Sequence, residues 1–147
     1  TKLELLLLGL ISSEEELRAL RARAITAGIN NVSRRIPEPV VLDEVEPIAT
    51  RLDQVAYDPR IPQLVRAYFS DMKRVLERAR NAMKPGGRLV LDIGDSCFAG
   101  VHVDTPSVLC QLAEGVGWEF KESVVLRSRS SKDGTPLCQK LLYLSSQ

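Results

Sequence analysis

The stretch A-M-K-P-G-G-R-L-V-L-D-I-G-D-S, residues 82–96, decides the fold of this chain. Before it, apolar residues recur at helical spacing over 65–83 while charged residues take the opposite face, which predicts an amphipathic helix. The turn at 84–87 ends that helix, because proline disfavours helix in the preceding residue and glycine permits a tight turn. Residues 88–93 are a nearly continuous apolar run, typical of a strand buried on both faces of a parallel sheet.

Toward the C-terminus, the sequence predicts one more helix and two more strands. Thr105 is expected to cap that helix and Pro106 to take its first position, where a missing N–H costs little. Residues 118–128 and 137–144 read as strands joined by a turn that contains Lys-Asp-Gly. The predicted fold is α/β, with helices, a central parallel strand and a C-terminal antiparallel hairpin.

Toward the N-terminus, residues 1–11 read as a buried helix rich in leucine. Ser12 and Ser13 then offer caps for a second helix, with glutamates at the three-residue spacing of a capping box. Five prolines fall within 33–62, which predicts an irregular connection that is either a binding loop or a surface excursion. We therefore divide the chain into a helical and irregular region, 1–62, and part of an α/β domain, 63–147.

Composition restricts the class of protein. A length of 147 residues suits one domain with one core, and a net charge of +1 gives no overall attraction to nucleic acid or membrane. Three cysteines without C-x-x-C spacing argue against a disulfide framework and favour a cytoplasmic location. The longest apolar run is too short to cross a bilayer, so we expect no membrane association.

The helix, the K-P-G-G turn and the apolar strand resemble one region of the class I, Rossmann-like methyltransferases that use S-adenosylmethionine. In that family a last helix and a β-hairpin follow, in the order predicted here. The stretches T-K-L-E-L-L-L-L-G-L at 1–10, Y-F-S-D-M at 68–72 and I-G-D-S at 93–96 resemble the bacterial N4-cytosine and N6-adenine DNA methyltransferases. The resemblance implies the C-terminal part of a restriction–modification enzyme whose target base is flipped out of DNA.

Two family motifs are missing. No glycine-rich cofactor loop follows a strand, and no Asp/Ser-Pro-Pro-Tyr motif occurs, since Tyr57-Asp58-Pro59 has the wrong order. We therefore expect this chain alone to bind no S-adenosylmethionine, to hold no metal or catalytic residue, and to act on DNA only with an N-terminal half or partner chain. The alternatives are a non-catalytic or split subunit, and a methyltransferase for RNA, protein or a small molecule.

The substrate-binding candidates are Gly94, Asp95 and Ser96, which end the predicted strand. Ligands bind at the carboxyl ends of strands in open parallel sheets. Gly94 would let backbone approach closely, while Asp95 and Ser96 would hydrogen-bond a base or ribose; the alternative is that they only complete a turn. His102 follows in the next loop, and we assign it no acid–base role because the sequence shows no partner for it.

Two pairs of arginines are candidates for nucleic-acid binding. Arg34 and Arg35 end a basic cluster, and Arg127 and Arg129 precede the predicted hairpin turn. Such side chains position proteins on phosphates, although solvated surface charges are the alternative. The strand at 88–93 is also expected to leave one edge unpaired, which favours a partner chain or a homo-oligomer.

Overall fold

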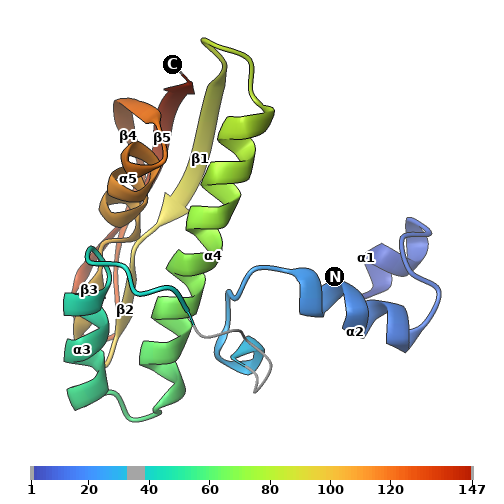
Figure 1. The fold of residues 1–147 in the computed structure, drawn as a ribbon. Coiled ribbons are helices and arrows are strands. Elements are labelled where there is room, and N and C mark those ends of the chain that lie inside the picture. The colour runs from blue at the N-terminus through green and yellow to red at the C-terminus, as the bar shows by residue number, and fades with distance from the viewer. Residues whose placement is uncertain (1, 33–38, 147) are drawn as a thin grey trace.

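The computed structural model describes residues 2–32 and 39–146, which form an α/β fold (Figure 1). A three-stranded sheet packs against two helices, and a separate two-stranded hairpin follows its first strand. The elements are α1 (Lys2–Leu7), α2 (Glu14–Arg23), the 3-10 helix η1 (Ile29–Asn31), α3 (Glu46–Val55), α4 (Arg60–Ala82), β1 (Arg88–Gly94), β2 (Ser96–Phe98), β3 (Val101–Val103), α5 (Thr105–Gly115), β4 (Trp118–Ser130) and β5 (Pro136–Ser146).

The larger sheet has the order β1-β5-β4, with β5 antiparallel to both neighbours. Strands β1 and β4 therefore run in the same direction, and α5 connects them across β5. A central strand in a parallel sheet, as the apolar run predicted, is not shown. Among the described residues β1 pairs only with antiparallel β5, so β1 lies at the edge of the sheet.

The faces of β1 differ, although its sequence is apolar on both. Leu89, Leu91 and Ile93 pack against the core, whereas Val90 and Asp92 are exposed on the other face. The single-face burial follows from the period of two along a strand and from helices that cover one side. A continuous apolar run cannot report which of its faces a helix covers.

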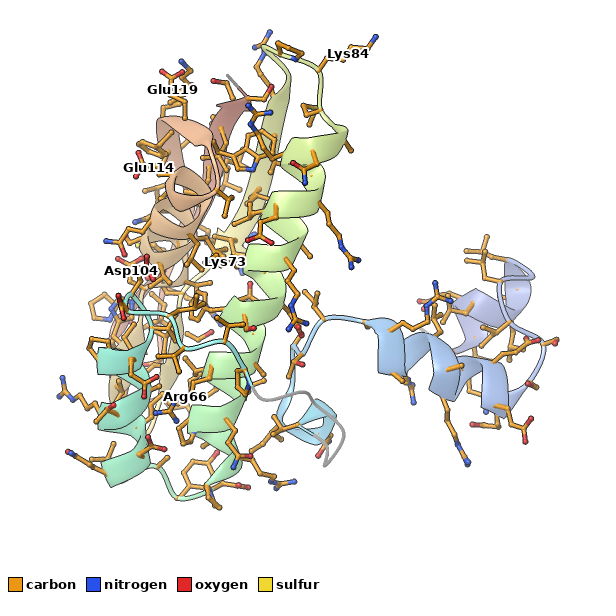
Figure 2. All side chains as sticks on the ribbon, viewed as in Figure 1. Arg66, Lys73, Lys84, Asp104, Glu114 and Glu119 are labelled. Atoms are coloured by element: carbon orange, nitrogen blue, oxygen red, sulfur yellow. The ribbon has the colours of Figure 1, made fainter. Side chains whose placement is uncertain are left out.

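The core lies between the sheet and the long helix α4 (Figure 2). Phe69 and Leu76 of α4 are almost fully buried, as are Leu142 and Leu144 of β5. Trp118, at the start of β4, is 3% exposed, and its Nε1 donates to the Leu76 carbonyl at 3.0 Å. The indole thus gains apolar contacts and a satisfied polar group together.

The prediction of an irregular segment over 33–62 is wrong for 46–55, which form α3, and α4 begins at Arg60. Pro47 and Pro62 lie in the first turns of these helices, where a missing N–H removes no intrahelical bond. Leu42 and Leu52 belong to the same core as α4, so the core includes residues before 63. Residues 33–38 lie outside the described residues.

The salt bridges of Arg66 join α3 to α4. The guanidinium of Arg66 contacts the carboxylates of Glu46 at 2.6 Å and Asp53 at 2.7 Å. The bonds from Arg66 lower the pKa of Glu46 and raise that of the arginine. These ion pairs hold α3 against α4, and α3 also contributes buried residues to the core. The prolines of 33–62 had suggested an irregular segment instead.

The N-terminal capping box is confirmed, because Ser13 Oγ accepts from Glu16 N at 3.2 Å and Ser12 N donates to Glu16 Oε2 at 2.6 Å. The prediction of a buried helix is wrong, since α1 has no buried residue and Leu7 is 86% exposed. In Figure 1, α1 and α2 project away from the sheet. A leucine-rich pattern predicts burial only where another element packs against it.

The cap of α5 and the segment after β1 differ slightly from the sequence predictions. Asp104, not Thr105, caps α5, because its Oδ1 accepts from Ser107 N at 3.2 Å. The loop predicted after β1 is the β2–β3 hairpin, whose two turn residues Ala99 and Gly100 have φ of 50° and 76°. Positive φ at both positions is the conformation of a type I′ turn, which matches the twist of the flanking strands.

Candidate functional site

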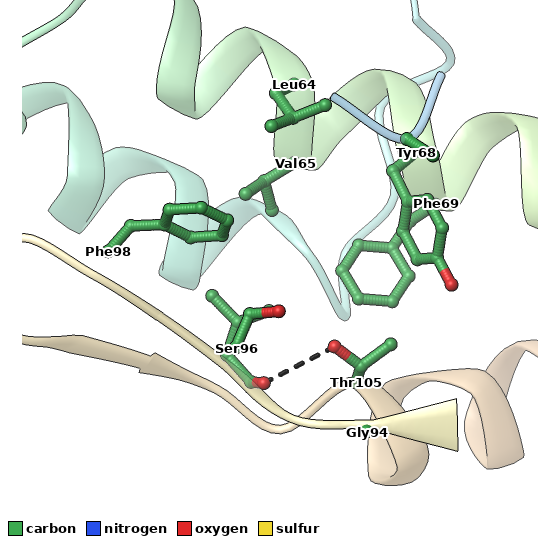
Figure 3. A pocket seen from close by; sticks show the side chains of 10 residues that line it. Leu64, Val65, Tyr68, Phe69, Gly94, Ser96, Phe98 and Thr105 are labelled. Carbon is green, nitrogen blue, oxygen red and sulfur yellow. Dashed lines mark hydrogen bonds between the residues drawn. The ribbon is translucent and has the colours of Figure 1, made fainter. Parts of the chain in front are cut away.

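A cavity of about 180 Å³ lies at the carboxyl end of β1 (Figure 3). Gly94 and Ser96 contribute to its wall, while Asp95 between them does not. The opposite wall comes from α4, which places Tyr68 and Phe69 toward the strand. The full lining comprises Ala27, Leu64, Val65, Tyr68, Phe69, Gly94, Ser96, Phe98, Val103 and Thr105.

The cavity is mainly apolar and aromatic. The rings of Tyr68 and Phe69 meet edge to face, with centroids 5.2 Å apart. Burial raises the pKa of Tyr68, so its phenol stays protonated at neutral pH. Thr105 Oγ1 donates to the Val103 carbonyl at 3.4 Å (Figure 3). Apolar walls with a few hydroxyl groups are typical of sites that bind small molecules.

The protein itself does not require glycine at position 94. A Cβ built there would lie 3.7 Å from the Cys138 carbonyl oxygen, which is an ordinary contact. Gly94 also lacks the positive φ that other turn glycines show. The fold therefore leaves room for a Cβ at position 94, and the close approach of a ligand to this glycine stays a prediction.

Asp95 is 6% exposed and holds two parts of the fold together. Its Oδ2 lies 2.9 Å from His102 Nε2 and accepts from Cys138 N at 3.2 Å, while its Oδ1 is buried without a hydrogen-bond partner among the described residues. In this structure the Oδ2 atom of Asp95 contacts the protein itself. The ligand-binding role of Asp95 therefore stays a prediction.

The partner of His102 was missed in the sequence. His102 is half-exposed on β3 and lies opposite Cys97 in the β2–β3 hairpin. That pairing folds β3 back toward Asp95, seven residues earlier in the chain. The available signal was Ala99-Gly100, a two-residue turn between short apolar segments, which would have brought His102 beside the end of β1.

The arginine candidates differ in what the structure describes. Arg34 and Arg35 lie outside the described residues. Arg127 and Arg129 are exposed on β4. Gly94 pairs with Gln139, and Gln139 pairs with Arg127, so these arginines lie at the end of the sheet that holds the cavity.

Neither a cofactor loop nor a metal cluster is found here. Strand β1 leads through Asp95 into the β2–β3 hairpin, whereas a dinucleotide-type loop opens directly into a helix. The residues at this strand end therefore do not fit S-adenosylmethionine. Within 2–32 and 39–146, no three histidine, cysteine, aspartate or glutamate side chains gather as metal ligands would.

In the same described ranges, no helix combines the length and apolar character that crossing a bilayer needs. Comparisons with protein-family models, curated proteins and solved structures found no match to this chain.

Proposed function

We propose that this chain is the C-terminal part of a Rossmann-like methyltransferase that transfers methyl from S-adenosylmethionine to an amino group of DNA. The target is N4 of cytosine or N6 of adenine. The proposal rests on the sequence resemblance and on the sheet, in which β1 and β4 run in the same direction and β1 has one edge without a partner among the described residues. It assigns the cavity at the carboxyl end of β1 to the target base.

The observation that supports the proposal most directly is the arrangement of β1, α5 and β4. A strand, a helix and a second strand in the same direction make the crossover unit of Rossmann-like sheets, here with β5 inserted between the strands. Strand β1 has seven regular pairs with β5 and no bulge, while its other edge has no partner among the described residues. Further parallel strands would extend the sheet at this edge.

The two edges of the sheet differ in a way that agrees with this assignment. Strand β4 carries two register irregularities and several charged residues, which are the features that protect permanently exposed edges. Between Arg88 and Asp92, β1 has only apolar residues and no irregularity. The β1 edge thus has the properties of an edge that another strand covers.

The residues of this chain would bind and orient the base. Ser96 would hydrogen-bond its polar rim, while Tyr68 and Phe98 would contact its flat surface. Gly94 would let the base approach the backbone. The cofactor and the groups that hold the amine would come from strands beyond the β1 edge, because the described residues do not fit them.

The proposal is tested by expressing this chain together with the coding sequence directly upstream of it. We expect transfer of labelled methyl from S-adenosylmethionine to DNA, with N4-methylcytosine or N6-methyladenine found by mass spectrometry of the nucleosides. The present chain alone should bind no S-adenosylmethionine in calorimetry. A saturable micromolar site on this chain would contradict the assignment of the cofactor to the missing strands.

The same assay separates the alternatives. If the label appears in RNA or in a small molecule and not in DNA, that acceptor is the substrate in place of DNA. No transfer to any acceptor would favour a non-catalytic subunit. The substitution Ser96→Ala tests the cavity, because loss of one buried polar contact costs about 1–3 kcal/mol and hence roughly 5- to 160-fold in rate.

A further inference from the structure

We infer that the helix pair α1–α2 is the surface through which two copies of this chain associate, with the two α2 helices antiparallel. We call this helix pair, residues 2–23, the arm. The contact is distinct from the open edge of β1 and does not depend on the proposed function. Leucines of α1 and of the loop after it supply its apolar part, while charged residues of α2 set the direction of the two helices.

The arm carries a concentrated apolar surface. Four of its leucines are largely exposed: Leu3 at 73%, Leu7 at 86%, Leu8 at 71% and Leu10 at 64%. Within residues 2–23, only Ile11 and Leu17 are buried. Single exposed leucines are ordinary on a protein surface, whereas four within so short a segment form a patch of the kind that protein interfaces cover.

The arm is held away from the rest of the fold. In Figure 1, α1 and α2 lie apart from the sheet and from α4, and the segment after Ala24 joins them to the rest. Thr26 fixes that segment, since it is 5% exposed and its N donates to Asp71 Oδ2 on α4 at 3.0 Å. A second arm can therefore approach the leucines without displacing any part of the core.

The charges of the arm suit a second copy of itself. Residues 2–23 contain four basic and four acidic residues, so the formal net charge of the arm is zero. Along α2 the two signs are segregated, with glutamates at 14–16 and arginines at 18, 21 and 23. Two copies can therefore meet without net repulsion, and the acidic end of one α2 attracts the basic end of the other.

The spacing of charges along α2 selects the antiparallel pair. Glu16, Leu20 and Arg23 share one stripe of the helix, because residues three and four apart lie on the same face. Leu20, near the middle of the stripe, is 41% exposed. When two α2 helices lie antiparallel about a twofold axis near Leu20, Glu16 of each copy faces the partner's Arg23. A parallel pair would place like charges side by side at both ends of the stripe.

Glu16 can serve its own helix cap and the partner together. Its Oε2 accepts from Ser12 N at 2.6 Å and from Ser12 Oγ at 2.9 Å. These bonds lower the pKa of Glu16, so its carboxylate is ionised at neutral pH. Neither bond uses Oε1, and the residue is exposed, so a guanidinium can approach Oε1 from outside the arm.

Sedimentation equilibrium of the 147-residue chain tests the interface. All variants carry Val90→Lys, which hinders pairing through the β1 edge, so that a remaining dimer reports on the arm. Leu7→Ala/Leu8→Ala should weaken the dimer about tenfold or more, because each copy loses apolar surface at the contact. The matched control is Val41→Ala/Val125→Ala, whose side chains are 72% and 55% exposed outside the arm. It should leave the dissociation constant unchanged.

Complementary charge variants test the direction of the helices. Arg23→Glu alone places two acidic side chains opposite each other in the antiparallel pair, and Glu16→Arg alone places two basic ones there. Each variant should therefore dimerise poorly. In an equimolar mixture the heterodimer pairs opposite charges at both ends again, so association should return, and high salt should weaken this recovery. Circular dichroism reports whether both variants keep α2.

Three results would overturn the inference. The first is a Val90→Lys chain that stays monomeric across the concentration series, and the second is equal affinity of the leucine variant and its control. The third is a mixture that does not associate although both charge variants keep wild-type circular dichroism. If Glu16→Arg loses helix with its Ser12 bonds, the leucine comparison decides, because those side chains are exposed.

The test also separates a second copy from another occupant. If no dimer forms but the upstream polypeptide binds the chain, and Leu7→Ala/Leu8→Ala weakens that binding, the arm serves the upstream polypeptide and the inference fails. None of these measurements involves methyl transfer. Failure of the proposed function would therefore leave the inference standing.

Discussion

Replacement of Asp95 by alanine should destabilise the fold rather than act only on the site. Asp95 Oδ2 is within hydrogen-bond distance of His102 Nε2 at 2.9 Å and accepts from Cys138 N at 3.2 Å. Alanine leaves the partly buried Cys138 N–H without its side-chain acceptor, while half-exposed His102 can turn to water. The cost of one unsatisfied buried donor is about 1–3 kcal/mol.

The thermal melt of Asp95→Ala, followed by circular dichroism, measures this cost. For a chain of this length, 1 kcal/mol corresponds to about 4 °C in Tm, so a decrease of about 4–12 °C is expected. Asp92→Ala is the matched control on the same strand. Its carboxylate is exposed, so the change in unfolding free energy should stay within about 0.5 kcal/mol.

A Tm of Asp95→Ala within about 1 °C of the wild type would refute the reasoning. The carboxylate would then be free to serve a ligand, as the sequence predicted. If Asp95→Ala instead melts early, a loss of methylation in this variant reports on folding. Ser96→Ala, which alters the cavity lining without removing a described structural bond, is then the sharper test of the site.

Three further predictions concern the rest of the chain. Arg66 lowers the pKa of Glu46, so the ion pair stabilises the fold at neutral pH, and this stabilisation is lost as pH falls through the folded-state pKa of Glu46. Arg66→Gln should lower the free energy of unfolding by about 0.4–2 kcal/mol at pH 7, and urea titrations should show that this difference vanishes in acid. Ala99→Gly should stabilise the chain by roughly 0.5–1 kcal/mol, because Ala99 has a φ of 50°, and an unchanged urea midpoint would contradict this. Wild-type chain should self-associate through β1 in light scattering at high concentration, whereas Val90→Lys should reduce association; a monomeric wild type would count against an open β1 edge.

Local sequence was sufficient for the elements whose causes lie within a few residues. The apolar spacing of 65–83 predicted α4, and the capping box of Ser13 and Glu16 was present as expected. The K-P-G-G turn and the run at 88–93 likewise predicted β1. In each of these elements, the signal and the structure it specifies share one stretch of chain.

Contacts between distant residues decided the rest. The insertion of β5 between β1 and β4 depends on pairs such as Leu91 with Leu142, and periodicity carries no information about such partners. Burial of α3, exposure of α1 and the bond between His102 and Asp95 also follow from what packs beside them. A local pattern reports which residues are apolar or polar, whereas the tertiary fold supplies the surface or partner that each one meets.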